Sequence, residues 1–139
     1  IGGTDVLRTV KTRRGQQYFR QVVINAYGGQ CCITGINIPR LLVASHICPW
    51  SDYTEGRLLP SNGLCLSALH DAAFDSGLMT LDVDCRVVLS REIKDRLPQE
   101  SLNFSFQRFE GKKIQMPSIL SSGPNQQFIE HHRNHIFKS

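Results

Sequence analysis

The chain has 139 residues, of which 40% are hydrophobic and 20% charged, a composition typical of one globular domain and unlike that of a disordered segment. Its 16 Lys and Arg against 12 Asp and Glu give a formal net charge of +4, which is compatible with a polyanionic partner without indicating one. No apolar run approaches the roughly 18 residues of a membrane span, so we expect no association with a membrane.

The five cysteines predict buried, reduced thiols rather than a disulfide framework. Their number is odd, no secretory signal opens the chain, and the absence of a CxxC pair argues against a zinc knuckle. We therefore expect a cytoplasmic location. The sequence begins at Ile1 rather than Met, and we expect it to be a fragment of a longer protein.

Residues 1–29 predict a basic arm followed by a helix. Residues 1–15 are polar, basic and contain glycine, and we interpret them as a mobile arm. A helix is predicted from Gln16 to Tyr27, because apolar residues recur there at i, i+3, i+4 and i+7 (Phe19, Val22, Val23 and Ala26). The pair Gly28-Gly29 is expected to end this helix.

Residues 30–90 predict two strands, a helix and a hairpin. A short strand and turn are predicted at 31–35, and a longer apolar strand at 41–48. A loop that contains proline and glycine is predicted at 49–61. Asn62-Gly63 is a turn signal before a brief strand at 64–66, and Ser67 is expected to cap a helix that runs to about Ser76. Residues 78–83 and 86–89 are typical of a β-hairpin.

Residues 91–139 predict a C-terminal extension with a closing helix. The stretch 98–123 contains two prolines and two glycines, and we expect it to be irregular. After Pro124, a second helical stripe is formed by Phe128, Ile129, His132, Ile136 and Phe137. The whole of 1–139 therefore predicts one mixed α+β domain.

Three polar residues carry most of the chemical signal. His46 ends an apolar, strand-like run, and Asp71 and Asp75 lie four residues apart, on one face of the predicted helix. A histidine facing two carboxylates suits a hard divalent cation and an activated water. Taken singly, each has a structural explanation, such as a hydrogen-bonded strand histidine or a solvated helix face.

The order and spacing of these residues resemble the HNH nucleases, whose catalytic unit is the ββα-metal fold. The matching motifs are SHICP around His46, NGL from Asn62, and Asp71 and Asp75 at nine and thirteen residues after that asparagine. The flanking segments RRGQQYFR, CCITG and HDAAFDSG resemble the restriction-type HNH endonucleases in particular. The resemblance implies a ββα-metal core and hairpin over 30–90, preceded by an N-terminal helix and followed by a C-terminal helix.

The resemblance implies a role for each residue. His46 would be the general base, Asp71 and Asp75 would bind Mg²⁺ (or Mn²⁺ or another divalent ion), and Asn62 would tie the loop to the strand and orient His46. His70 points about 100° away from Asp71 on a helix, so a catalytic contact and a packing role both stay open. Many family members carry an acidic residue or histidine just before the catalytic histidine, where this chain has Ser45, a poor metal ligand.

The implied activity is DNA phosphodiester hydrolysis, in restriction or phage defence. Two rivals stay open: a catalytically inactive nucleic-acid-binding module with an HNH-like fold, and a structural interaction domain. A homodimer would allow both strands to be cut, and a recognition or sensor domain would lie outside this fragment. The candidate phosphate contacts are Arg13, Arg14, Arg20, Arg57, Lys112 and Lys113.

Overall fold

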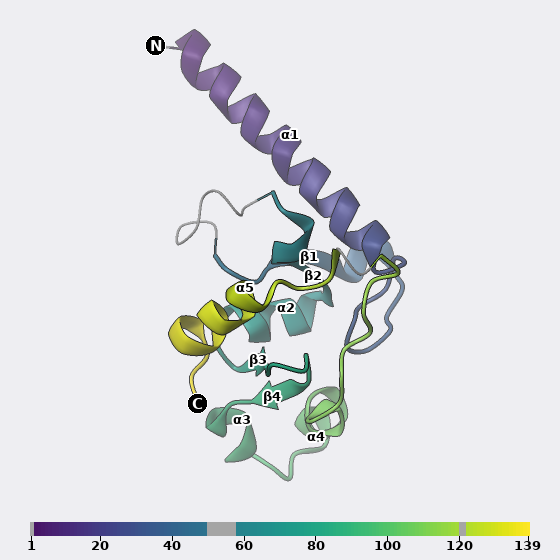
Figure 1. The fold of residues 1–139 in the computed structure, drawn as a ribbon. Helices are drawn as coiled ribbons and strands as arrows, with labels where there is room; N and C mark the ends of the chain where they lie inside the picture. Colours follow the sequence, from purple (N-terminus) through teal and green to yellow (C-terminus); the bar gives the residue numbers. More distant parts are fainter. Residues whose placement is uncertain (1, 50–57, 120–121) are drawn as a thin grey trace.

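In the computed structural model, a two-stranded sheet lies between two helices (Figure 1). The structure describes residues 2–49, 58–119 and 122–139, with side chains from Thr12 onward. The principal elements, in chain order, are α1 (Gly2–Ala26), β1 (Leu42–His46), β2 (Gly63–Ser67), α2 (Ala68–Asp75), β3 (Met79–Leu81), β4 (Val87–Leu89), α3 (Arg91–Lys94), α4 (Glu100–Ser105) and α5 (Gln126–His131). The predicted α+β class with a ββα core is confirmed.

Helix α1 starts far earlier than the sequence pattern predicts. The expected arm at 1–15 is wrong, because the helix is continuous from Gly2 to Ala26 and its first half projects away from the sheet (Figure 1). No proline lies in this stretch, and a helix already formed at its C-terminal half extends readily through Arg, Lys and Gln. Gly28 and Gly29 have φ of 66° and 71°, so the predicted end of the helix is confirmed.

Strands β1 and β2 are antiparallel, with His46 opposite Gly63 and Ser45 opposite Leu64. Because side chains alternate between the faces of a strand, His46 and Ser45 point to opposite sides of this sheet. Helix α1 covers the His46 side, where Phe19, Val23 and other apolar residues are buried. Helix α2 follows β2 directly and covers the Ser45 side. One short strand therefore supplies side chains to both faces.

Helix α2 begins and ends where the sequence predicts. The side chain of Ser67 accepts a hydrogen bond from the backbone N–H of His70 at the N-terminus. Gly77, with φ of 83°, follows the C-terminus, and a side chain there would collide with the carbonyl of Ile136. The cap and the glycine thus fix both ends of a helix of only eight residues.

Two other predicted segments differ from the structure. Residues 31–35 form a turn rather than a short strand, closed by the N–H of Gly35 donating to the carbonyl of Cys31. The stretch 98–123 is not irregular throughout, since α4 and a 3-10 turn at Gln107–Phe109 lie within it. The turn at 31–35, α4 and the 3-10 turn are short elements whose stability comes from tertiary contacts, and local sequence patterns do not encode such contacts.

The C-terminal elements return to the ββα unit. Strands β3 and β4 form the predicted hairpin, and α5 continues into a π-helical turn at His132–Ile136. The backbone N–H of Lys138 donates to the carbonyl of Gly77, which ties the chain end to the end of α2. The last helix therefore packs beside α2, and His132 at its end bonds to the carbonyl of Phe74, which is 58 residues away in sequence (Figure 1).

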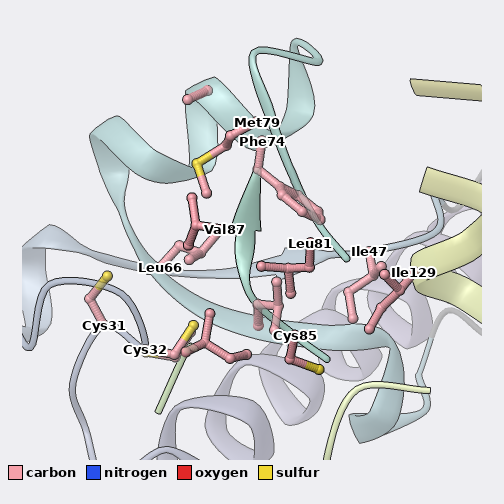
Figure 2. Packing of buried hydrophobic residues seen from close by; sticks show 14 of the residues in the cluster. Cys31, Cys32, Ile47, Leu66, Phe74, Met79, Leu81, Cys85, Val87 and Ile129 are labelled. Carbon is pink, nitrogen blue, oxygen red and sulfur yellow. The ribbon is translucent and has the colours of Figure 1, made fainter. Parts of the chain in front are cut away.

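A single cluster of buried apolar side chains joins the sheet, the hairpin and the flanking helices (Figure 2). Leu66 and Phe74 of the ββα unit are in it together with Leu81 of the hairpin and Ile129 of α5. All five cysteines are buried, as predicted for reduced thiols. Among the described residues, no helix has both the length and the apolar character needed to cross a lipid bilayer.

Candidate active site

His46 lies at the last position of β1, against α1. Its imidazole ring stacks on the phenyl ring of Phe19, with centroids 4.1 Å apart and planes 3° from parallel. The ring is half-buried, while Phe19 is 2% exposed. The histidine is thus held by packing on one face and stays accessible from elsewhere.

Asn62 ties the segment after His46 to the start of β2. Its side-chain oxygen accepts the N–H of Cys48 at 2.8 Å, and its side-chain nitrogen donates to the carbonyl of Cys48 at 3.1 Å. Its own carbonyl accepts the N–H of Ile47 at 2.9 Å. Because Asn62 is fully buried, these bonds fix the backbone directly after His46. This geometry matches the bridging part expected of Asn62.

Asp71 and Asp75 lie on the face of α2 that is turned toward β1. Both line a cavity of about 380 Å³ together with His46, Ser45, His132 and Ile136. The five consecutive residues from Val43 to Ile47 also line it, so the cavity runs along the outer edge of β1. The structure therefore brings together the histidine and the two carboxylates that the sequence singled out.

The two carboxylates are close enough to influence each other. Partial burial raises the pKa of Asp75 to about 6, and the nearby negative charge of Asp71 adds to this rise. The hydroxyl of Ser45 opposes it weakly. Among the described residues, neither carboxylate belongs to an ion pair; the pair found is Lys94 with Glu110, at 3.1 Å. A bound cation would supply the missing positive charge.

Ser45 provides a further sign that the site takes a ligand. Its side chain is 2% exposed, and its hydroxyl oxygen has no hydrogen-bond partner at standard distance within the described part of the chain. Buried hydroxyls are normally paired, and this one interacts with the carboxylate of Asp75 without a hydrogen bond of standard geometry, so a water or a hydrated cation fits beside the two carboxylates. No group of three His, Cys, Asp or Glu side chains gathers among the described residues. The donors present fit Mg²⁺, which commonly binds one or two carboxylates and keeps several waters.

His70 lies on the other side of α2, outside this cavity. Its Nδ1 lies 2.7 Å from the hydroxyl of Ser67, and its Nε2 lies 2.8 Å from the carbonyl of Ser105. Burial lowers its pKa, while the bond to the Ser105 carbonyl opposes this shift. The catalytic alternative for His70 does not fit this placement, because both ring nitrogens are used in a bridge between α2 and α4.

His132 is a cavity residue that the sequence did not single out. Its Nε2 donates to the carbonyl of Phe74 at 2.9 Å, its Nδ1 accepts from Thr80 at 2.7 Å, and its ring stacks on that of Phe74 at 3.7 Å. Burial first, and then the charge of His131, lowers its pKa to about 4. Its place in the apolar stripe after Pro124 was the available signal, and that stripe predicts burial only.

The candidate phosphate contacts fall into separate groups. Arg13 and Arg14 are exposed on α1, and Lys112 and Lys113 are exposed beside β4. Arg20 instead donates to the backbone carbonyls of Leu42 and Pro39, at 2.9 Å and 3.3 Å. Arg57 lies outside the described residues. A second cavity joins α1 to β1, and it shares Val43, Ala44 and His46 with the first.

Comparison with known proteins agrees with this geometry. A family model of HNH endonucleases matches residues 31–82. Among solved structures, the fold is similar to that of the modification-dependent TagI restriction endonuclease, with a TM-score of 0.54 and 18% identity, over 84% of this chain and 36% of that one. No curated protein matches the sequence. The matched segment contains β1, β2 and α2 with His46, Asn62, Asp71 and Asp75, so the ββα unit is the part of this chain that is similar to the HNH endonucleases.

Proposed function

We propose that this chain is the nuclease domain of a metal-dependent DNA endonuclease, with His46 as the general base. The observation that carries the proposal is the convergence of His46, Asp71 and Asp75 on one cavity at the edge of β1. A base and an acidic cation site within one cavity are the parts that phosphodiester hydrolysis requires. The match to the HNH endonuclease family supports the same reaction.

In this reaction His46 takes a proton from a water molecule as the oxygen of that water attacks the scissile phosphorus. The bond from phosphorus to the 3′ oxygen breaks, the leaving 3′ oxygen takes a proton from solvent water, and the products carry 5′-phosphate and 3′-hydroxyl ends. Asn62 holds the backbone after His46 in place through its bonds to Cys48. Asp71 and Asp75 would hold a divalent ion, Mg²⁺ in the first instance, which when bound stabilises negative charge on the phosphate.

The residues at the site favour a cation that takes only some of its ligands from the protein. Asp71 and Asp75 supply two carboxylates, and Ser45 supplies a neutral hydroxyl where an acidic residue would be a stronger ligand. Water and a DNA phosphate oxygen would complete the coordination. We therefore expect weak metal binding without DNA and tighter binding in its presence.

The chain also fits a larger assembly. It spans 36% of the restriction endonuclease with which it shares its fold. We propose that 1–139 is one nuclease domain, with an N-terminal part at 1–29, the ββα core and hairpin at 30–90, and a C-terminal extension at 91–139. A recognition or sensor domain elsewhere in the protein would select the DNA, and a homodimer would cut both strands in restriction or phage defence in the cytoplasm.

Ser45 favours one alternative, a nucleic-acid-binding module that has lost catalysis. The hydroxyl replaces an acidic ligand, and no three-residue metal cluster is found in the described part of the chain. This alternative predicts DNA binding that is sensitive to salt, without cleavage at any concentration of Mg²⁺ or Mn²⁺.

A plasmid-nicking assay with increasing Mg²⁺ or Mn²⁺ separates the two functions. The unmodified chain should nick DNA, and His46→Ala should lower the rate by about 10²- to 10⁴-fold, the usual contribution of a general base. Asp71→Asn should raise the Mg²⁺ concentration needed for half-maximal rate. Wild-type rates in His46→Ala would remove this histidine from the reaction, and DNA binding without any nicking would favour the binding module.

A further inference from the structure

We propose that Phe19 of α1 is a positioning residue for His46, so that the helix preceding the HNH segment completes the active site. This inference rests on the proposed role of His46. Phe19 lies outside residues 31–82, the part of the chain that matches the family. Its ring is nevertheless in face-to-face contact with the His46 imidazole, at 4.1 Å and 3°.

Phe19 is itself fixed by its surroundings. It is 2% exposed and lies one helical turn before Val23, which is fully buried on the same face of α1. A core aromatic ring packed in this way has few alternative rotamers, because interiors are filled at close to crystal density. The imidazole therefore rests on a rigid surface rather than on a mobile side chain.

Gly63 explains why α1 can approach so closely. It lies directly opposite His46 in the β1–β2 register, on the face that α1 covers. A β-carbon at this position would lie 2.8 Å from Cζ of Phe19 and would also collide with Val23. Its φ of −127° is open to any residue, so space and not backbone conformation requires the glycine. The glycine thus leaves room for Phe19 beneath His46.

The stacking has two consequences for a general base. It covers one face of the imidazole and restricts rotation of the ring about its Cβ–Cγ bond, so a ring nitrogen keeps its direction toward the attacking water. When His46 takes the proton, the resulting imidazolium lies over the face of the phenyl ring, in the arrangement of a cation–π contact. Both effects act on the chemical step and leave the two carboxylates of α2 untouched.

The test compares Phe19→Leu with Val23→Ala, two truncations of neighbouring buried side chains on one helix. Single-turnover cleavage is measured with the protein in saturating excess over the DNA and at saturating Mg²⁺, together with thermal unfolding and the ring proton resonances of His46. Phe19→Leu should slow cleavage about 10-fold, the scale expected for a misplaced catalytic group, without changing the Mg²⁺ concentration for half-maximal rate. It should also abolish the upfield ring-current shift of the His46 protons.

Val23→Ala should destabilise the fold comparably, yet keep the ring-current shift and a rate within about twofold of wild type. Phe19→Met, which fills a similar volume with a flexible chain, serves if the leucine variant does not fold. A wild-type rate in a folded Phe19 variant that has lost the ring-current shift would overturn the inference. Absence of cleavage by the unmodified chain would instead count against the proposed function, while the resonances would still report the stacking.

Discussion

The two sides of helix α2 both carry ionisable side chains, but these lie in different environments. On the side facing β1, Asp71 and Asp75 line an open cavity beside the buried hydroxyl of Ser45. On the other side, His70 is 3% exposed and bridges Ser67 to the carbonyl of Ser105. One short helix therefore carries two carboxylates without a cationic partner among the described residues on one side, and a buried, hydrogen-bonded histidine on another.

The difference between the two sides lies in how completely the polar groups are bonded within the protein. His70 and His132 each have both ring nitrogens bonded within the protein, so a proton can be gained only by breaking a buried bond. The carboxylate pair of α2 lacks a cationic partner among the described residues. The carboxylate pair is thus the group on α2 that a bound cation could still pair with, whereas the two histidines have no ring nitrogen left to offer a ligand.

Replacing His70 removes the hydrogen bonds that bridge α2 and α4, and it should have the largest effect on stability. His70→Ala leaves the Ser105 carbonyl unpaired and opens a cavity beside Phe106, whose ring lies 4.9 Å away. We expect the free energy of unfolding to fall by about 2–4 kcal/mol, measured by urea denaturation. The cleavage rate of the folded variant should stay near wild type, and a drop at a temperature where it is fully folded would place His70 in the reaction.

The second prediction concerns the loss of stability at acidic pH that results from the lowered pKa of the buried His132. Its pKa lies at about 4 in the folded protein against 6.5 for an ordinary histidine, so the unfolded chain binds an additional proton between these values. Stability is therefore fully present above pH 6.5 and falls as the pH is lowered toward 4, by up to about 3 kcal/mol from this residue. Asp75, whose pKa is raised to about 6, acts with the opposite sign.

The comparison with His132→Gln isolates this contribution, because Asp75 is common to both proteins. Urea denaturation in metal-free buffer at pH 7.5 and at pH 4.5 gives the loss for each. The wild type should lose more stability than the variant on acidification. Equal losses would show that His132 is already accessible to protons in the folded state.

The smallest expected effect is a change in the salt dependence of DNA binding when cations of α1 near the His46 cavity are removed. Arg13 and Arg14 lie three and two residues before Gln16 on α1, and Gln16 lines the cavity between α1 and β1 that includes His46. Changing both to Ala should reduce the slope of log K against log salt concentration by about 2, as measured by fluorescence anisotropy in the His46→Ala background.

The matched control is the pair Lys112 and Lys113, which lines neither of these two cavities. Its double alanine variant should change the slope less than the arginine variant does. A larger change of the slope in the lysine variant than in the arginine variant would indicate that DNA passes along the β4 side rather than along the cavity between α1 and β1. Unchanged slopes in both variants would leave all four cations as solvated surface charge.

Local patterns predicted much of the core. The helical stripe of α1, the Ser67 cap of α2 and the β3–β4 hairpin all follow from short-range rules and are present. The same rules failed for the first half of α1 and for α4, where composition suggested irregular chain. These segments have weak periodicity, and their conformation depends on helix continuation or on contacts made elsewhere.

The sequence by itself determined which residues share a local face: the four-residue spacing puts Asp71 beside Asp75, and strand alternation separates Ser45 from His46. Only the tertiary structure decided that Phe19 lies beneath His46, that His132 reaches the carbonyl of Phe74, and that His70 is turned away from the cavity. The physical reason is that helix and strand periods act over a few residues, whereas these contacts join segments tens of residues apart through packing of one shared core.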